Sequence, residues 1–451
     1  MRVLFFTHPG TNSRDILLDM ALGFEKAGHE VIQWELEPWA NLFKSAGPAQ
    51  KQVVAQATAM FSRFIEANRI DLSIGMWANA LGSLAHGFRD GQPVSFFELT
   101  GHPHLMFWLD APHWAGGGSM QELFGSPLLR TERIRHYVNN AGIAREMMEV
   151  LGFGATIGRR YGINEDVFRP YPEQARKYDI VFGLGPGDGK PSELMLRELE
   201  SDDPDVDAIR AERADSVRPK LVDCAQSFAG EHVGAMIELF LALLDRRLGP
   251  PGRPMLDDLA ALESSGHAEA GRVLRANPKA LVRAFSLLRS IDAWRRAFTI
   301  THLSQRLNCA VFGSASLEHW PCRATMLGDL QYQDMARAYS SGLIGLNAMR
   351  WQDDIGLNLK PYEITASGAC LLCDGRVGFE EAFEPGVEAE CFQSPGEALQ
   401  KARSLVGDPD RARQMADAGR ARTLRDHTWS AAADELIEFA INGPRRLRQA
   451  A

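Results

Sequence analysis

Short apolar runs alternate with helical patterns along the first part of the chain, and this alternation restricts the possible folds more than any other feature. Buried parallel strands that are covered by helices on both faces have this composition. Apolar runs are read as strands, and stretches with apolar residues three and four apart are read as helices. The predicted strands are 2–7, 30–34, 70–74, 93–99, 105–109 and 135–139, and the predicted helices are 16–28, 50–68 and 141–151. The pattern predicts a Rossmann-like α/β domain.

A polar segment with prolines at 164–172 interrupts the alternation and predicts a linker to a second domain. Strand signals return afterwards, and a long stretch among them has helical patterns with almost no strand signal, which predicts a helical insertion. The strand signals are at 178–184, 308–312, 343–346 and 369–373, and a helical tail follows at 394–440. We therefore predict an α/β fold of two Rossmann-like domains facing a cleft. The domains span residues 1–170 and 171–440, the insertion lies at about 192–301, and a basic tail occupies 441–451.

The segment 346–386 contains the richest motif, a strand, a polar loop, a helix that Gly368 ends and another strand. A loop that enters a helix offers unpaired backbone N–H groups to a phosphate, and Lys360 adds a positive charge there. Glu363, one turn later, could accept hydrogen bonds from a ribose. An exposed helix pair of opposite charge explains the same two residues equally well. The pattern alone leaves both interpretations open.

This segment resembles the C-terminal half of glycosyltransferases with the two-domain GT-B fold, specifically the spore-maturation (CgeB-like) group. The resemblance rests on Lys360, Tyr362, Glu363, Ala366, Gly368 and Asp374, and on the segments 379–386, 408–409, 418–420 and 427–428. It covers the C-terminal third well and the first domain more loosely. Members usually have arginine at the position of Lys360. A second glutamate that is common in the wider fold class is replaced here by Ile355, with Asp353 and Asp354 nearby.

A glycine-rich loop at 183–190 follows the first strand of the second domain. Its glycines would let the backbone approach a pyrophosphate, and Lys190 would neutralise charge there. The loop is not a Walker motif, because Pro191 occupies the place of the magnesium-binding hydroxyl residue. A surface turn is the alternative interpretation. The resemblance favours a loop that faces the donor diphosphate.

The resemblance implies a glycosyltransferase that moves a sugar from a nucleotide-activated donor to an acceptor that the sequence does not identify, whether protein, lipid or glycan. It implies no metal and no other cofactor, because helix N-termini and basic side chains stabilise the departing diphosphate. The implied donor-binding residues are Gly185, Gly187, Lys190, Tyr332, Asn347, Arg350, Lys360, Tyr362 and Glu363. A sugar-nucleotide epimerase of similar build and a non-catalytic binding or assembly protein are the alternatives.

The predicted strand at 105–109 ends in Asp110, and open α/β sheets bind ligands beyond the carboxyl ends of their strands. Asp110 is therefore a candidate general base for an acceptor hydroxyl, with His102, His104 or His113 as alternatives. Capping of the following turn is the other interpretation for Asp110, and buried hydrogen bonding is the other one for the histidines. Their spacing matches no closed zinc motif, so a metal site is not expected.

The first loop contains Gly10, Thr11 and Asn12 and has one glycine, which is too few for a dinucleotide fingerprint. The resemblance implies that this loop contacts acceptor or phosphate. Cys370 and Cys373 look like a redox pair, but they lie in a predicted buried strand, where residues three apart point to opposite faces.

Composition excludes several other classes of protein. With 45% apolar and 24% charged residues the chain has the balance of a soluble globular protein, and its net charge of −9 disfavours nucleic-acid binding. Six cysteines and the lack of a signal-like start predict a cytoplasmic protein with reduced thiols. The basic tail supports at most peripheral membrane contact. The oligomeric state stays open.

Overall fold

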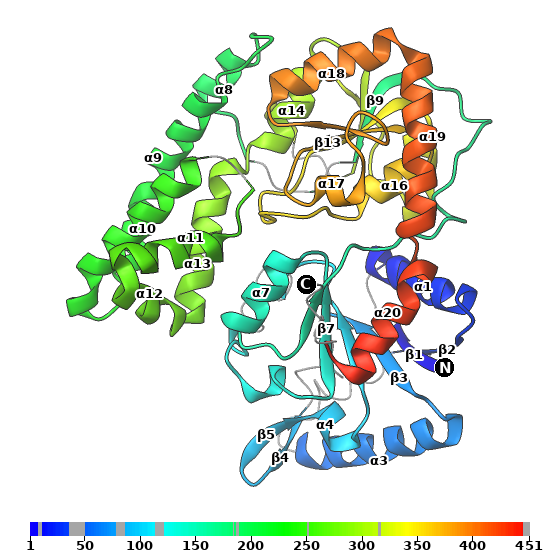
Figure 1. The fold of residues 1–451 in the computed structure, drawn as a ribbon, viewed down its shortest axis with the longest axis vertical. Helices are drawn as coiled ribbons and strands as arrows, with labels where there is room; N and C mark the ends of the chain where they lie inside the picture. The colour runs from blue at the N-terminus through cyan, green and yellow to red at the C-terminus, as the bar shows by residue number, and fades with distance from the viewer. Residues whose placement is uncertain are drawn as a thin grey trace, which may run out of the picture. The chain divides into compact units, whose positions relative to one another are not determined.

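A computed structural model describes residues 1–7, 11–35, 50–77, 86–112, 121–183, 185, 189–249, 252–313 and 317–444. The chain forms two compact units (Figure 1). The first comprises Met1–Asn164 and Thr428–Ala451, and the second comprises Glu165–His427.

The first unit is built on a parallel sheet of six strands in the order β2-β1-β3-β6-β7-β8. Its inner strands are apolar and buried, as expected for a sheet covered on both faces. The strands are β1 (Arg2–Thr7), β2 (Glu30–Glu35), β3 (Leu72–Met76), β6 (His104–Phe107), β7 (Ile134–Val138) and β8 (Thr156–Gly158). The helices between them are α1 (Thr11–Lys26), α3 (Gln50–Asn68), α4 (Phe96–Thr100) and α7 (Ala141–Glu149), with the single turn η2 (Pro127–Leu129).

The strand predicted at 93–99 is wrong. Its first part is β5 (Gln92–Ser95), which pairs antiparallel with β4 (His86–Arg89) in a separate hairpin. The rest forms α4, because the Ser95 side chain caps the helix by accepting from the Glu98 N–H, and Gly101 ends it at a φ of 67°. Local capping thus overrides the apolar run.

The boundary between the units differs from the expected one, because the chain leaves the first unit at Asn164 and returns to it at Thr428. The last helix, α20 (Trp429–Asn442), packs against α1 of the first unit instead of belonging to the second domain. Trp429 is fully buried among the rings of Phe107, Tyr137 and Tyr161. Burial of the Trp429 indole therefore holds the start of α20 in the first unit.

The second unit contains another parallel sheet of six strands, in the order β11-β10-β9-β12-β13-β14. The strands are β9 (Tyr178–Gly183), β10 (Cys309–Phe312), β11 (Thr325–Met326), β12 (Gly342–Asn347), β13 (Cys370–Asp374) and β14 (Glu390–Phe392). The helices are α8 (Glu193–Glu198), α14 (Arg295–Ser304), α15 (Met335–Ser340), α16 (Lys360–Ala366), α17 (Phe379–Ala382), α18 (Pro395–Gly407) and α19 (Pro409–Asp426), with the turn η6 (Tyr332–Asp334). Helix α14 packs against α18, and α16 packs against α19 (Figure 1). The predicted fold class, two parallel α/β sheets with a helical insertion, is confirmed.

The helical insertion is narrower than expected. Met195 of α8, Phe298 of α14 and Trp294, the residue before α14, belong to the core of the second sheet. Only the helices between them pack mainly on one another, and Figure 1 shows them gathered into a bundle. We call this group the α9–α13 bundle. It consists of α9 (Val206–Ala225), η3 (Gly230–His232), α10 (Val233–Leu248), α11 (Met255–Leu262), η4 (Glu263–His267), α12 (Ala268–Arg275) and α13 (Pro278–Arg289), and the turn η5 (Ser290–Asp292) leads from it to α14.

The six cysteines form no disulfide. Cys370 and Cys373 both lie in buried β13, and burial raises the pKa of the Cys370 thiol to about 12. A thiol of that kind stays protonated at neutral pH. Among the helices in the described part of the chain, none has the length and apolar character needed to cross a membrane.

The contact between α1 and α20 predicts the effect of one substitution. A Cβ atom at Gly23 would lie 2.2 Å from the Trp429 Cβ, so Gly23→Ala must displace α20. We expect the free energy of unfolding to fall by about 1–3 kcal/mol, measured by denaturant titration. In Gly234→Ala on α10, nothing lies within 4 Å of the added carbon, and stability should be unchanged or slightly higher. Equal stability of the two variants would contradict the assignment of α20 to the first unit.

Candidate functional site

The strand order of the second unit marks one place on its sheet where a ligand is expected. From β9 the chain moves outward through β10 and β11, then returns to β12 beside β9 and continues to the other side. Open α/β sheets bind ligands beyond the carboxyl ends of the strands at such a change of direction. The two strands here end at Gly183 and Asn347.

Lys360 begins α16 and reaches over the end of β10. Its Nζ lies 5.7 Å from the centroid of the Phe312 ring, and Phe312 is the last residue of β10. Burial lowers the pKa of Lys360, and the nearby charge of Glu363 opposes this. The positive charges of Arg296 and Arg350 lower it further. Two arginines from different segments therefore act on Lys360 at this edge of the sheet.

Arg296 is a member of this group that the sequence analysis did not identify. It comes from the first turn of α14 and is 8% exposed. Its guanidinium carbon lies 5.7 Å from the centroid of the Phe182 ring, and a Cβ at Gly185 would lie 3.6 Å from its Nη1. The guanidinium therefore lies beside the end of β9 and the start of the glycine-rich loop. No local motif distinguishes Arg296 from the other arginines of the insertion.

Gly183 is required at the end of β9 by close packing. A Cβ there would lie 2.8 Å from Phe312 Cζ and 2.9 Å from the Tyr339 hydroxyl oxygen, closer than real Cβ atoms approach. Burial raises the pKa of Tyr339 well above its usual value, the charge of Glu363 raises it further, and Arg296 opposes the shift. A neutral hydroxyl thus lies within the same charged group.

Glu363 is 3% exposed and lies one turn after Lys360 on α16. An exposed i,i+3 pair, the alternative weighed for these two residues, is therefore wrong. Because a buried carboxylate needs compensating charge, Glu363 and Lys360 stabilise each other's ionised forms. Helix α16 spans only two turns, so side-chain charge rather than a helix dipole is the chief attraction for an anion here.

Three predicted donor residues point into packed surroundings instead of lining an open site. The ring of Tyr362 is fully buried against Phe383 and His427, with centroids 5.8 and 4.5 Å apart. Tyr332 is 3% exposed and packs edge to face on Phe168. Asn347 is the last residue of β12 and is completely buried, with its Nδ2 3.3 Å from Cys373 Sγ. For Tyr362 the cause is helical rotation, because a residue two positions after Lys360 faces the other side of α16.

The glycine-rich loop is described only in part. Gly185 lies next to Arg296, whereas Gly187 lies outside the described residues. Gly189 has a φ of 68°, and its carbonyl accepts a 3.0 Å hydrogen bond from the Trp320 indole. Lys190 is exposed. The structure therefore brings Gly185 to the charged group and gives Lys190 no contact with it.

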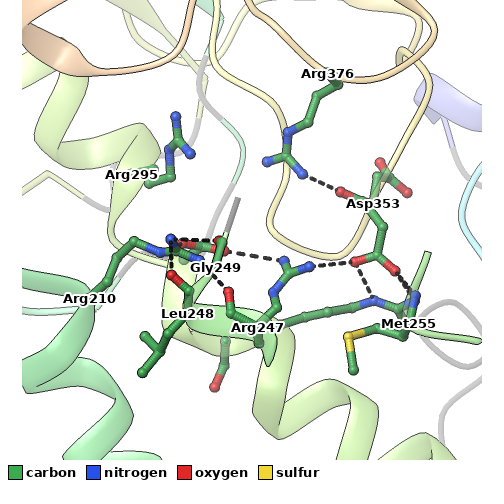
Figure 2. A network of polar contacts seen from close by, with 12 residues as sticks. Arg210, Arg247, Leu248, Gly249, Met255, Arg295, Asp353 and Arg376 are labelled. Carbon is green, nitrogen blue, oxygen red and sulfur yellow. Dashed lines mark hydrogen bonds and ion pairs between the residues drawn. The ribbon is translucent and has the colours of Figure 1, made fainter. Parts of the chain in front are cut away.

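The structure separates the roles of the two neighbouring aspartates, which the sequence left open. Asp353 lies 3.1 Å from the Arg350 guanidinium, and its backbone carbonyl accepts from Arg376 at 2.5 Å (Figure 2). Asp354 instead accepts from Arg247 and Arg289 of the α9–α13 bundle at 3.1 and 2.6 Å. Asp353 therefore holds an arginine of the candidate site, whereas Asp354 joins the loop to the bundle.

In the first unit, Asp110 follows β6 at the carboxyl edge of the sheet, as predicted. It is half-buried. The Tyr161 hydroxyl lies 2.6 Å from the carbonyl of Trp108 and 3.1 Å from that of Leu109, which fixes the backbone leading to Asp110. The position suits a group that acts on a ligand at this edge.

His102 lies at the opposite, amino end of β6 and is 4% exposed. Burial lowers its pKa to about 4, Arg133 lowers it further, and Asp71 opposes the shift. The structure therefore does not bring His102 to the edge where Asp110 lies. His104 is buried as well, with its Nδ1 2.9 Å from the Ser73 hydroxyl. His102 and Asp110 are close in sequence but not in space, because residues just before and just after a strand lie at opposite edges of the sheet.

The remaining predicted residues lie wholly or partly outside the residues that the structure describes. Gly10 and His113 lie outside the described residues, as do the side chains of Thr11 and Asn12, which begin α1. In the described ranges, no three His, Cys, Asp or Glu side chains gather in a way that could hold a metal ion.

A comparison with protein families identifies one segment of the chain. Residues 292–438 match the family model described as glycosyl transferase-like. The match contains Arg296, Arg350, Lys360 and Glu363, and it confirms the predicted enzyme class for this part of the chain. It begins after α13, so the α9–α13 bundle lies outside it.

Three of the solved structures that are similar to this chain match it over nearly its whole length. HepE of Anabaena in complex with UDP and glucose has 11% identity and a TM-score of 0.49 over 97% of this chain and 98% of that chain. Sucrose-phosphate synthase of Thermosynechococcus elongatus has 12% identity and a TM-score of 0.45 over 97% of each chain. A mutant β-glucosyltransferase of phage T4 with UDP-glucose has 10% identity and a TM-score of 0.46 over 98% of this chain and 100% of that chain. No curated protein matches the sequence.

The buried histidines of the first unit predict a loss of stability in acid. The folded-state pKa of His102, about 4, lies below its unfolded value of 6.5, so the folded state keeps the neutral ring. Its contribution is complete above pH 6.5 and falls by about 1.4 kcal/mol per pH unit as the pH drops toward 4. In His102→Gln the fall of unfolding free energy over this window should be shallower than in the wild type, measured by denaturant titration at several pH values. Parallel profiles would contradict a buried neutral His102.

Proposed function

We propose that the protein is a metal-independent GT-B glycosyltransferase that transfers a sugar from a nucleotide-activated donor to an acceptor still to be identified. The observation that carries the proposal is the meeting of Lys360 and Arg296 at the carboxyl ends of β9 and β10. Both residues lie in the glycosyl transferase-like segment. Two cations beside a glycine-lined strand end suit a diphosphate, and the change of strand direction is where the fold class binds nucleotides.

The chemistry of sugar transfer explains why cations are needed at this place. As the bond between the sugar and the diphosphate breaks, negative charge grows on the departing diphosphate. Fixed cations in a partly desolvated site stabilise that charge more in the transition state than in the ground state. In this proposal Lys360 and Arg296 contact the diphosphate, with Arg350 as a third cation. Glu363 orients Lys360 and accepts from the ribose.

Asp110 is proposed as the general base that removes the proton from the acceptor hydroxyl if the reaction inverts configuration. If configuration is retained, Asp110 orients the acceptor instead. Gly10, Thr11 and Asn12 are proposed to contact acceptor or phosphate, on the strength of the family resemblance. We assign the protein to the CgeB-like group and to the cytoplasm on the motifs and composition given above.

Removing the site cations should weaken nucleotide binding. We expect Lys360→Ala and Arg296→Gln each to raise the Kd for a nucleoside diphosphate by about 10- to 100-fold, because each loses a charge-assisted hydrogen bond. Calorimetric titration with UDP, GDP, ADP and dTDP measures this. Lys220→Ala removes an exposed lysine of α9 and should bind like the wild type. Wild-type affinity in both site variants would contradict the proposed donor site.

Metal removal gives a second test of the proposal. Release of a nucleoside diphosphate from a panel of nucleotide sugars should continue at an unchanged rate in excess EDTA, because side chains carry the charge that a metal would otherwise balance. Loss of turnover that added Mg²⁺ or Mn²⁺ restores would refute metal independence. An isomeric nucleotide sugar formed without nucleoside diphosphate release would instead indicate an epimerase.

A further inference from the structure

The α9–α13 bundle is joined by buried charges to the loop between β12 and α16, residues 348–359. The Asp354 side chain accepts from Arg247 of α10 at 3.1 Å and from Arg289 of α13 at 2.6 and 3.1 Å. It also accepts from the backbone N–H of Met255, the first residue of α11, at 3.1 Å. Three helices of the bundle thus converge on one carboxylate of the loop. Figure 2 labels two of the contributing residues, Arg247 and Met255.

A second aspartate extends this connection. Asp292, between the bundle and α14, lies 3.1 Å from Arg210 of α9 and 3.2 Å from Arg247. Arg210 also donates to the carbonyls of Arg247 and Leu248 at 2.6 and 3.2 Å, which caps the end of α10 (Figure 2). Arg247 therefore bridges both aspartates. The bundle is held where α14, the helix of Arg296, begins.

Breaking the buried ion pairs between the bundle and the loop is unfavourable in free energy. Arg247, Arg289, Asp292 and Asp354 are all at most 6% exposed. Burial acts to raise the pKa of Asp354, but Arg289 and Arg247 outweigh it and lower the pKa to about 2. Removing one member of such a group leaves a buried charge without compensation. The loop is therefore fixed to the bundle in one geometry at neutral pH.

The same loop contains Arg350 and leads into Lys360, two of the three cations of the candidate site. Asp354 follows Asp353, which holds Arg350 at 3.1 Å, and the loop ends where Lys360 begins α16. The Gly356 N–H of the loop also donates to the Val377 carbonyl, at 2.8 Å. A shift of Asp354 would therefore move Asp353, which orients Arg350. It would also move the end of the loop that leads into Lys360.

We propose that the α9–α13 bundle is a positioning element of the donor site: by holding Asp354 it keeps the 348–359 loop, and with it Arg350 and Lys360, in the arrangement that receives a diphosphate. The proposal rests on the proposed function. Asp354 acts through the loop and is a positioning residue, and the bundle that holds it lies outside the glycosyl transferase-like match. A bundle of this kind makes donor affinity depend on helices that do not contact the donor.

The test compares Asp354→Asn and Arg289→Lys with a matched control. Arg289→Lys keeps the charge and loses the two-pronged contact, so it remains informative if Asp354→Asn does not fold. The control is Asp258→Asn, because Asp258 is a 2% exposed carboxylate of α11 whose partners, Arg246 and Arg253 at 2.9 and 3.4 Å, do not belong to the loop. All three substitutions disturb ion pairs that the bundle makes with a buried carboxylate, although Arg246 and Arg253 are themselves 35% and 43% exposed.

Two measurements are made on each full-length variant. Hydrogen exchange without ligand should become about tenfold faster for amides of 348–359 in Asp354→Asn and Arg289→Lys, and should stay at the wild-type rate there in Asp258→Asn. The Kd for whichever of UDP, GDP, ADP and dTDP the wild type binds best should rise about tenfold in the first two variants and stay constant in the control.

The two readouts separate the possible failures. Wild-type exchange in the loop of both Asp354→Asn and Arg289→Lys would overturn the proposal, and so would equal effects of Asp258→Asn on loop exchange and affinity. Faster loop exchange with unchanged nucleotide affinity would also overturn it, because the loop would then be held for stability alone. If the wild type binds none of the four nucleotides, the proposed function fails, and the positioning of a donor site fails with it.

Discussion

Positive charge gathered at one edge of the second sheet is the feature to which the rest of this unit is adapted. Arg296 from α14 and Arg350 from the 348–359 loop both act on Lys360 of α16, in surroundings that water only partly screens. Bringing such charges together is unfavourable unless carboxylates offset them. Glu363 and Asp353 supply that offset, and both are at most 3% exposed. The fold thus holds a charged group whose natural complement is a further anion.

The sequence was sufficient for the features that depend on local patterns. Apolar runs identified most strands, because a strand buried on both faces must be apolar throughout its length. Strands of two or three residues, such as β11 and β14, carry too few residues to show a pattern. Lys360 and Glu363 were predicted because they share a motif within one helical turn. Arg296 was missed because its place beside Phe182 results from the packing of α14 on the sheet, which no spacing in the sequence reveals.

Two further errors follow from geometry that the sequence does not contain. Tyr362 belongs to the family-like motif, but helical rotation carries its ring into the core against His427. The sequence predicted a helical tail at 394–440, but it could not identify what the last helix of that tail packs against. The partner is the first unit, where Trp429 packs among aromatic rings more than two hundred residues away in sequence.

An ionic connection between the bundle and the loop has a property that an apolar one would lack. Apolar surfaces remain in contact when they slide, since the hydrophobic effect depends on area and not on direction. A guanidinium that donates from two nitrogens to a carboxylate is satisfied in only one orientation, and in a dry interior any other orientation is heavily penalised. Arg289 binds Asp354 in this manner. If the loop places cations to within a hydrogen-bond length of a diphosphate, as proposed, a directional anchor serves it better than a larger apolar contact would. On that proposal, buried charge is the fitting way for the α9–α13 bundle to meet the loop.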